Sequence, residues 1–429
     1  MASQLPVAVF GAGPVGLAAA AHLSERKVPF VVFESGSSVG ASIRQWGHVR
    51  LFSPWGLDID RAAQRLLKAG GWQSPDPAAH PTGAEIVERY LTPLAQLDAF
   101  APRIRLGQRV IAVTRRGVDK LRDDRRSERA FIVTTEGSAG VTRTPVGAVI
   151  DATGTWLTPN PVGADGVPAV GETLARERIH YGIPDVLNAD RDRYAGRRVA
   201  VVGSGHSAKH AVRELSVLAE HEPDTTVTWI VRKGRDDRLF GDALDTRLPE
   251  RGKLGADAHH LVASGRVRLK TGFRVERVVI DESGLVLVSE QDRAAGPFDL
   301  VIAATGLRPD FSFLREMRLD LDPWVESTRA LAPLIDPNLH SCGSVPPHGA
   351  AELAHPEEGF YAIGAKSYGR APNLLLATGY EQARSVVAQL AGDHDAADRV
   401  ELVLSHTGSS CGVTTEPALE PEPAGACCG

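Results

Sequence analysis

Cysteine and long apolar runs are scarce in this 429-residue sequence. Its four cysteines are too few to hold a chain of this length together by disulfide bonds. No apolar run approaches the roughly 18 residues of a membrane span, and a first strand expected by about Leu5 leaves no room for a signal peptide. The net charge of -5 offers no basic face for nucleic acid or an anionic membrane. These absences indicate a soluble, cytoplasmic protein, and the length favours two or three domains.

The N-terminal stretch VAVFGAGPVG predicts a dinucleotide-binding turn. An apolar strand over residues 7–10 runs into Gly11, Gly13 and Gly16 and then into an alanine-rich helix. The first glycine permits the turn, the second lets the backbone approach a pyrophosphate, and the third lets the helix pack closely on the strand. A second apolar strand ends at Glu34, whose carboxylate is suited to accept hydrogen bonds from a ribose.

A second copy of this turn begins at VAVVGSGHSA. Its glycines are Gly203 and Gly205, and Ala208 replaces the third. Beyond its second strand the chain carries Arg232 and Lys233, where the first copy has an acid. Because two cations attract a 2′-phosphate that a carboxylate would repel, this copy is predicted to bind NADPH in preference to NADH.

With one such turn at its start and another after a long interval, the chain resembles the two-dinucleotide-binding flavoproteins over nearly its whole length. In that family the first turn holds FAD, and an inserted second domain holds the nicotinamide nucleotide. The stretches AVIDATG (148–154) and LVIAATG (300–306) resemble the motifs where the chain crosses between the two domains. The charged segment within residues 103–135 resembles the β-meander and solvated loop of such folds.

The resemblance implies an α/β fold in which a Rossmann-type FAD domain is interrupted by an inserted Rossmann-type NADPH domain. The expected boundaries are 1–165 for the first part of the FAD domain, 166–324 for the NADPH domain and 325–392 for the closing part of the FAD domain. Residues 393–429 are rich in Pro, Glu, Gly, Ser and Thr, which predicts a mostly disordered tail that contains cysteine.

The closing part is expected to complete the flavin site. A strand that begins at Phe360 stops at Gly364, and an amphipathic helix is predicted from about Asn373 to Leu390. In the resembling flavoproteins this helix points its N-terminus at the flavin, where a positive dipole end stabilises the negative charge of the reduced ring. Lys366 lies close to the position where disulfide reductases carry an Asp, and is therefore a candidate cation beside the flavin.

Three kinds of flavoprotein compete for this sequence. Disulfide reductases need a cysteine pair beside the flavin, and the chain has no C-x-x-C or C-x4-C spacing. Flavin-containing monooxygenases are more similar in GSGHSA, in the Ala-Thr-Gly linkers and in RQWGHVRLFSPWG (44–56). His180 occupies its place in the monooxygenase motif F-x-G-x-x-x-H, although Leu174 and Arg176 replace the Phe and the Gly. The third kind is a redox-sensing flavoprotein without turnover. The runner-up to a monooxygenase is an NADPH-dependent flavin reductase that passes electrons to a partner protein or quinone.

Residues 340–412 resemble most specifically the flavin monooxygenase-like proteins encoded in bacterial arsenic-resistance operons, and WGHVRLFSPW and PTGAEIVERYLTPLA agree with this. The resemblance implies FAD and NADPH as cofactors, with oxygen and a soft nucleophile such as a trivalent arsenical as reactants. It also leaves room for a homodimer and for a thioredoxin-type or other partner from an arsenic operon.

The cysteines suggest how such a substrate is captured. Thiolates are soft ligands that suit trivalent arsenic, and the vicinal pair Cys427 and Cys428 resembles the pair on the mobile C-terminal arm of mercuric reductases. Cys411 in the tail and Cys342 in the folded part join this predicted capture set. The alternative is a tail whose cysteines have no role. No spacing matches a standard zinc site, so no metal is expected.

The site predictions are as follows. The catalytic candidates are Trp46, His180 and Lys366. The predicted cofactor-binding residues are Gly11, Gly13, Pro14, Gly16, Glu34, Ser35, Arg44, Trp46, Ser53, Thr153, Gly154, Gly364, Lys366, Asn373, Gly203, Ser204, Gly205, His206, Ser207, Arg232, Lys233, Thr305 and Gly306.

Overall fold

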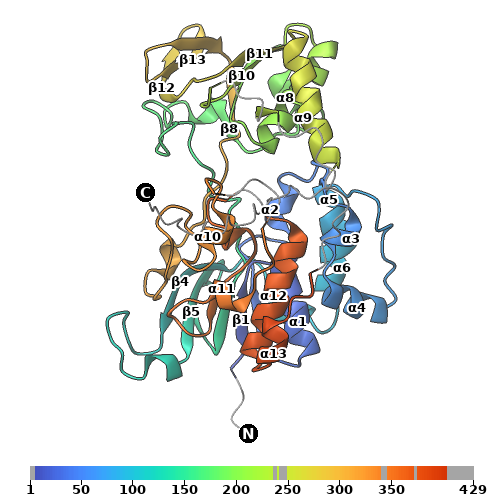
Figure 1. The fold of residues 1–429 in the computed structure, drawn as a ribbon, viewed down its shortest axis with the longest axis vertical. Coiled ribbons are helices and arrows are strands. Elements are labelled where there is room, and N and C mark those ends of the chain that lie inside the picture. Colours follow the sequence, from blue (N-terminus) through green and yellow to red (C-terminus); the bar gives the residue numbers. More distant parts are fainter. Residues whose placement is uncertain (1–4, 235–238, 241–248, 340–344, 372–373, 403–429) are drawn as a thin grey trace, which may run out of the picture.

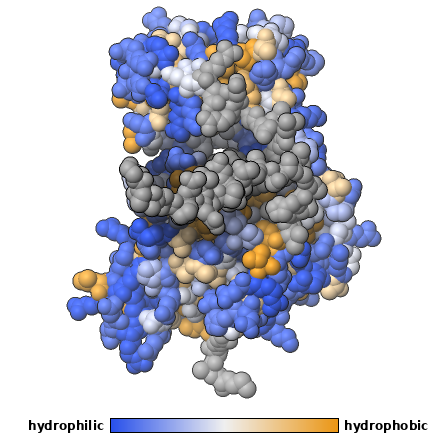
Figure 2. Space-filling model, viewed as in Figure 1, coloured by the Kyte–Doolittle hydropathy of each residue, from blue (hydrophilic) through white to orange (hydrophobic). Residues whose placement is uncertain are grey.

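The computed structural model describes residues 5–234, 239–240, 249–339, 345–371 and 374–402. Two α/β domains are stacked along the long axis of the molecule, with the first domain below the second in Figure 1. No helix within these ranges has the length and apolarity needed to cross a membrane. On the face shown in Figure 2, hydrophilic side chains dominate the described surface of both domains.

The first domain is organised around a parallel sheet in the order β16-β7-β1-β2-β3. Its central strands carry apolar side chains on both faces, as expected for a parallel sheet that is covered on both sides. The strands are β1 (Val7–Phe10), β2 (Phe30–Phe33), β3 (Ile104–Arg105), β7 (Ala148–Asp151) and β16 (Phe360–Ala362). The predicted strand over residues 7–10 is therefore confirmed.

Two layers cover this sheet. Alternate side chains such as Val9 and Val32 pack with the helices α1 (Pro14–Glu25) and α12 (Leu376–Leu390). Their neighbours, such as Ala8 and Phe33, pack on the other face against an antiparallel sheet. That sheet consists of β4 (Arg109–Arg115), β5 (Phe131–Gly137) and β6 (Gly140–Val146), so the expected β-meander is present and runs beyond residue 135.

The second domain repeats these layers. Its parallel sheet has the order β11-β10-β9-β15-β8, with α8 (His206–His221) and α9 (Pro249–Ala263) on one face. A three-stranded antiparallel sheet packs on the other face. The strands of the domain are β8 (Ile179–Tyr181), β9 (Arg198–Val202), β10 (Thr226–Ile230), β11 (Val267–Lys270), β12 (Val275–Asp281), β13 (Gly284–Ser289), β14 (Ala294–Phe298) and β15 (Leu300–Ala303).

Two connector segments, residues 155–161 and 304–310, join the domains side by side. The Asn160 amide donates to the Gly306 carbonyl at 2.9 Å, and the Arg308 amide donates to the Thr158 carbonyl at 3.0 Å. Just beyond the second segment, Leu314 packs into the core of the first domain. The chain thus re-enters the first domain ahead of the boundary expected at 324.

Short helices complete the first domain and the connection to β9. They are α2 (Ala41–Arg44), α3 (Trp55–Asp58), α4 (Arg61–Ala69), α5 (Gly83–Ile86), α6 (Thr92–Ala95), α7 (Arg191–Tyr194), α10 (Ala332–Ile335), α11 (Ala350–Leu353) and α13 (His394–Asp398).

The C-terminal end of the described chain is ordered further than expected. Helix α13 lies inside the segment 393–429, which was predicted to be mostly disordered, so that prediction is wrong for the residues up to Leu402. The buried Arg384 of α12 explains the order, because its guanidinium donates to the carbonyls of Ala396 and Arg399 while pairing with Glu381 at 2.7 Å.

Candidate functional site

A cavity of about 1450 Å³ extends from the first glycine turn to the second domain. It exceeds the range of roughly 300–1,000 Å³ that is usual for a small-molecule site, so it has room for an elongated ligand. Gly13 and Glu34 line the cavity in the first domain, and His206 and Arg251 line it in the second. The predicted residues Gly11, Pro14, Ser35, Trp46, Ser53, Thr153, Gly154 and Gly364 also lie in its wall.

The first glycine turn has the geometry of a phosphate cradle. Gly11 has a φ of +91°, and a Cβ on Gly16 would lie 2.0 Å from the Gly11 carbonyl oxygen, so helix and strand touch there. A Cβ on Gly13 would meet nothing within 4 Å. Gly13 is also the N-cap of α1 and supplies no side-chain cap, which leaves the first N–H groups of the helix available to an anion. The turn therefore fits the pyrophosphate of FAD.

Glu34, directly after β2, is held in one orientation. One carboxylate oxygen accepts a hydrogen bond from the Ala12 amide at 2.7 Å, and the other accepts one from the Gly36 amide at 2.7 Å. Only 9% of the residue is exposed, and it lines the cavity. Its remaining lone pairs suit the hydroxyl groups of a ribose.

The second glycine turn repeats the cradle outside the cavity wall. Gly203 has a φ of +134°, and a Cβ on Gly205, the N-cap of α8, would meet nothing within 4 Å. Arg232 and Lys233 follow β10 and are exposed, and their contact with a 2′-phosphate stays a prediction. The remaining predicted residues here, Ser204 and Ser207, lie at the same helix end, whereas Thr305 and Gly306 lie in the connector.

His206 links the two regions. It is the first residue of α8, it lines the cavity, and its ring lies 5.3 Å from that of Phe52 in the first domain. The Arg251 guanidinium donates to its Nε2 at 2.9 Å. Arg251 could not be predicted from sequence, because α9 is far from the glycine turn along the chain.

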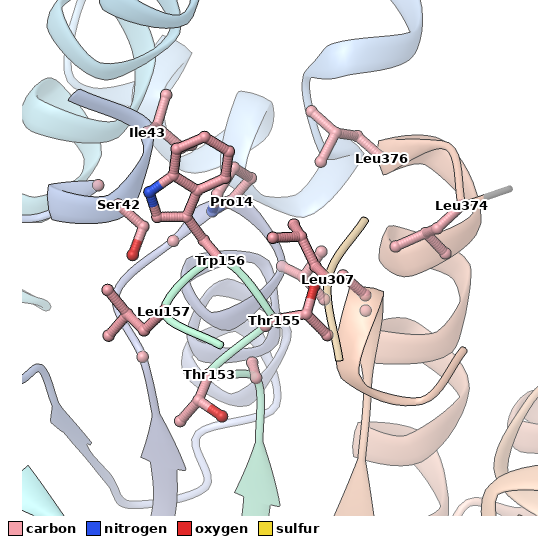
Figure 3. Close-up of a pocket in the computed structure, with 18 of the residues that line it drawn as sticks. Pro14, Ser42, Ile43, Thr153, Thr155, Trp156, Leu157, Leu307, Leu374 and Leu376 are labelled. Carbon is pink, nitrogen blue, oxygen red and sulfur yellow. The ribbon is translucent and has the colours of Figure 1, made fainter. Parts of the chain in front are cut away.

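Apolar side chains form the middle of the cavity wall. The Trp46 ring lies 6.2 Å from that of Trp156, whose Nε1 donates to Gln45 at 2.9 Å. Figure 3 shows Trp156 opposite Leu307 and Leu376, with the latter at the start of α12. Of these, Trp156, Leu307 and Leu376 were not predicted, although a tryptophan two residues after the Ala-Thr-Gly turn was a usable signal.

Lys366 does not have the position expected of it. The residue is 1% exposed and lies outside the cavity wall, although Gly364 and Ala365 line it. Its ammonium lies 2.8 Å from the carboxylate of Asp151. The prediction that Lys366 contacts the flavin is corrected, because its buried ammonium pairs with Asp151 and donates to the Thr153 hydroxyl and the Asp310 carbonyl.

His180 also lies outside the cavity wall. It is in β8, and burial lowers its pKa. It belongs to a seam of titratable groups between the domains, in which the His48 and His210 rings are 6.1 Å apart. Burial lowers the pKa of His210 to about 4 and raises the pKa of Glu214, one turn along α8, to about 7.

Two further predicted residues stand apart from the groups above. Arg44 in α2 is exposed and does not line the cavity. Ser53 lines it from a buried position, where its hydroxyl donates to Asp58 at 2.6 Å. Burial raises the pKa of Asp58 to about 7. Asn373, Cys342, Cys411, Cys427 and Cys428 lie outside the described residues.

Comparison with known proteins places the chain among flavoprotein and nicotinamide-nucleotide folds. The profile of the family described as pyridine nucleotide-disulphide oxidoreductase matches residues 8–340. No curated protein sequence matches the chain. Among solved structures, bacillithiol disulfide reductase from Bacillus cereus is 20% identical, with a TM-score of 0.65 over 91% of this chain and 99% of that one.

Two monooxygenase structures are similar as well. A flavin-containing monooxygenase from Stenotrophomonas maltophilia is 22% identical, with a TM-score of 0.57 over 91% of this chain and 98% of that one. The ornithine N-hydroxylase of Kutzneria sp. 744, solved with reduced FAD, NADP+ and L-ornithine, is 16% identical, with a TM-score of 0.56 over 91% and 100%. At these identities the likeness establishes the fold: two Rossmann-type domains, one inserted in the other.

Proposed function

The chain belongs to the pyridine nucleotide-disulphide oxidoreductase family and is an enzyme with FAD and NADPH as cofactors, and from this premise we propose that it is a flavin monooxygenase-like oxidoreductase. Its proposed substrate is a soft nucleophile, namely a trivalent arsenical, and its proposed role is arsenic detoxification. The observation that carries the proposal is the single cavity that joins the first nucleotide cradle to the second domain through an apolar middle section.

Each of the two glycine turns is proposed to bind one of the two cofactors. The N-terminus of α1 would hold the FAD pyrophosphate, and Glu34 would hold the ribose. The N-terminus of α8 would hold the NADPH pyrophosphate, and Arg232 and Lys233 would hold its 2′-phosphate. The chemistry that FAD supplies when bound is acceptance of a hydride from NADPH and delivery of its electrons to oxygen.

The apolar wall supports oxygen chemistry. Trp46, Trp156 and Leu376 give the middle of the cavity an apolar lining, and an apolar site from which bound ligands displace water would limit the side reaction that releases peroxide. Disulfide reduction needs a thiol pair beside the flavin. None of the residues that the structure describes is a cysteine, and the sequence contains no closely spaced inner pair. The wall therefore favours transfer of oxygen to a substrate.

The position of the last described residues supports the proposal of a soft substrate. Leu402, the last described residue, lines the cavity, and Arg384 secures the residues just before it. The segment that contains Cys411, Cys427 and Cys428 therefore begins at the cavity wall. Thiolates tethered there would raise the local concentration of a trivalent arsenical, and Cys342 is proposed to belong to the same capture set.

The test is aerobic NADPH oxidation by the FAD-loaded protein, with and without trivalent arsenicals, while peroxide and pentavalent arsenic are counted. A monooxygenase places one oxygen atom of O2 on arsenic and reduces the other to water. The expected result is faster NADPH oxidation, one pentavalent product for each NADPH, and little peroxide. Oxidation that yields only peroxide, whatever arsenical is present, would overturn the substrate assignment.

Truncation after Ala426 tests the proposed capture. Removing Cys427 and Cys428 should leave kcat at saturating arsenical unchanged and lower kcat/KM by about tenfold, because the loss is one of local concentration. A full-length chain with both cysteines replaced by Ser controls for the change in length and should behave in the same way. Rates that match the intact chain at low arsenical would contradict capture.

A further inference from the structure

A buried ion pair lies directly behind the cavity wall of the first domain. Asp151, the last residue of β7, is 0% exposed, and Lys366, just beyond β16, is 1% exposed. Their charged groups are 2.8 Å apart. Because β7 and β16 are neighbouring parallel strands, the pair sits where both strands end at the cavity edge of the sheet. Neither residue touches the cavity itself.

The pair is bonded to two segments that do form the site. Asp151 Oδ1 accepts hydrogen bonds from the Thr153 amide at 3.1 Å and from its hydroxyl at 2.7 Å. The Lys366 ammonium donates to the Thr153 hydroxyl at 3.0 Å and to the Asp310 carbonyl at 2.6 Å. Thr153 and Asp310 both line the cavity, and Asp310 ends the connector that returns from the second domain.

The surroundings keep the ammonium in this place. The rings of Phe311 and Phe313 lie 5.0 Å and 4.5 Å from the Lys366 nitrogen, so its remaining side faces aromatic rings. Asp151 Oδ2 lies 2.8 Å from the ammonium, and among the described residues it has no other partner. Loss of the ammonium would leave a buried carboxylate without a counter-charge.

Stability alone does not account for such a pair. Taking two charges out of water costs about as much as their attraction returns, and a well-packed apolar pair of similar volume is often as stable. What an apolar pair could not do is hold a hydroxyl and a carbonyl oxygen at fixed positions. The pair therefore has a geometric use, and the groups that it holds belong to the flavin turn and to the connector.

We propose that Asp151 and Lys366 are positioning residues that fasten the Thr153–Gly154 turn of the FAD site to the connector of the second domain. The Lys366 ammonium thereby fixes the position of Thr153 in the FAD site and that of Asp310 at the end of the connector. The inference rests on FAD binding at the first turn, as proposed above, and not on the identity of the substrate.

The main test compares Lys366→Met with Arg126→Met. Arg126 is a matched control, since it is also a buried cation, 5% exposed and paired with Glu357 at 2.8 Å. Unlike the hydrogen-bond partners of Lys366, its partners Glu357, Asp119 and Glu316 do not line the cavity. Lys366→Met should weaken FAD binding by about tenfold or more, the usual loss for a hydrogen bond to a charged group. It should also slow anaerobic flavin reduction by NADPH, because the connector loses its anchor.

The two variants separate positioning from stability. Arg126→Met should lower the unfolding temperature of the apoprotein and leave FAD affinity and anaerobic reduction unchanged. Both readouts are taken without substrate, so they do not depend on whether an arsenical is oxidised. If Lys366→Met lowers the unfolding temperature as Arg126→Met does, with FAD affinity and reduction rate as in the parent, the pair is structural only and the proposal is overturned.

Two further variants keep the proposal falsifiable if Lys366→Met does not fold. The double variant Asp151→Asn with Lys366→Met removes both charges, so no unpaired carboxylate remains, and it should still bind FAD weakly. Thr153→Val leaves the ion pair intact and removes the hydroxyl that it holds, so it should weaken FAD binding while the connector stays anchored and reduction per bound flavin is preserved. Parent-like FAD affinity in both variants would overturn the proposal.

Discussion

The two glycine turns share one backbone geometry, and two of the differences between them bear on how a nucleotide binds. Gly13 and Gly205 are each the N-cap residue of a helix, and both have an extended backbone conformation. A Cβ on either glycine would meet nothing within 4 Å. At the third glycine position the first turn has Gly16, where a Cβ would lie 2.0 Å from a carbonyl oxygen. The second turn has Ala208 there, whose methyl group is fully buried. The first turn therefore has no room for a Cβ at this position, whereas the second turn accommodates one.

The second difference lies after the second strand of each copy. Glu34 is fixed by two backbone amides and is almost fully buried. Arg232 is exposed and has one long hydrogen bond, 3.4 Å, to the Ala164 carbonyl. A rigid, buried acceptor suits a cofactor that stays bound, and an exposed cation suits one that exchanges in every turnover. This difference supports the proposal that FAD binds at the first turn and NADPH at the second.

The largest effect is expected at the third glycine position. Gly16→Ala places a methyl group against the Gly11 carbonyl oxygen, which costs about 1–3 kcal/mol or more, and should abolish stoichiometric FAD binding. The reciprocal variant Ala208→Gly is the control, and should cost about 1 kcal/mol through helix propensity while FAD content stays the same. FAD content and unfolding temperature measure both. Full FAD content in Gly16→Ala would show that the first turn tolerates a Cβ at this position, as the second turn does.

An intermediate effect is expected at the cations. Arg232→Ala should raise the KM for NADPH about tenfold, which corresponds to one lost charged contact, and should change the KM for NADH little. Arg274→Ala is the matched control, since Arg274 is an exposed arginine of the same domain paired with Glu290. Initial rates with each nucleotide measure the effect. An equal rise for NADPH and NADH would remove the assignment of the 2′-phosphate to Arg232.

The smallest effect is expected at Glu214 of α8, in the seam between the domains, and it concerns the pH dependence of stability. Burial raises the pKa of Glu214 from 4.5 to about 7. The stabilisation from its protonated carboxyl group is therefore complete below pH 4.5 and is lost as the pH rises through 7. Glu214→Gln should therefore become more stable relative to the parent as pH rises from 5 to 8. The pKa of His210 is lowered, so its contribution is lost in the opposite direction, as pH falls from 6.5 toward 4.

Denaturant unfolding at several pH values measures this difference. Glu220→Gln, which changes an exposed residue of the same helix paired with Arg266, is the control and should follow the parent at every pH. A Glu214→Gln curve parallel to that of the parent would mean that Glu214 is charged throughout and that the seam is not sensitive to pH in this range.

Local sequence predicted the elements that local forces build. The strand at 7–10, both glycine turns and the acid or cation after each second strand were all readable, because strand, turn and helix follow one another directly along the chain. The predicted helix before Leu390 exists but begins at Leu376. The ordered residues of α13 were missed, because their order depends on Arg384, a buried partner on another helix.

The sequence by itself determined the architecture and the two cradles, since glycine is required wherever a Cβ would strike the facing backbone. Only the tertiary structure decided where the Lys366 ammonium goes, because its partners Asp151 and Asp310 come from distant strands and a connector. The apolar cavity wall and the seam between the domains were decided in the same way. Each is a contact between segments far apart in the chain, and the energy that selects such contacts is that of packing and desolvation, which no local pattern records.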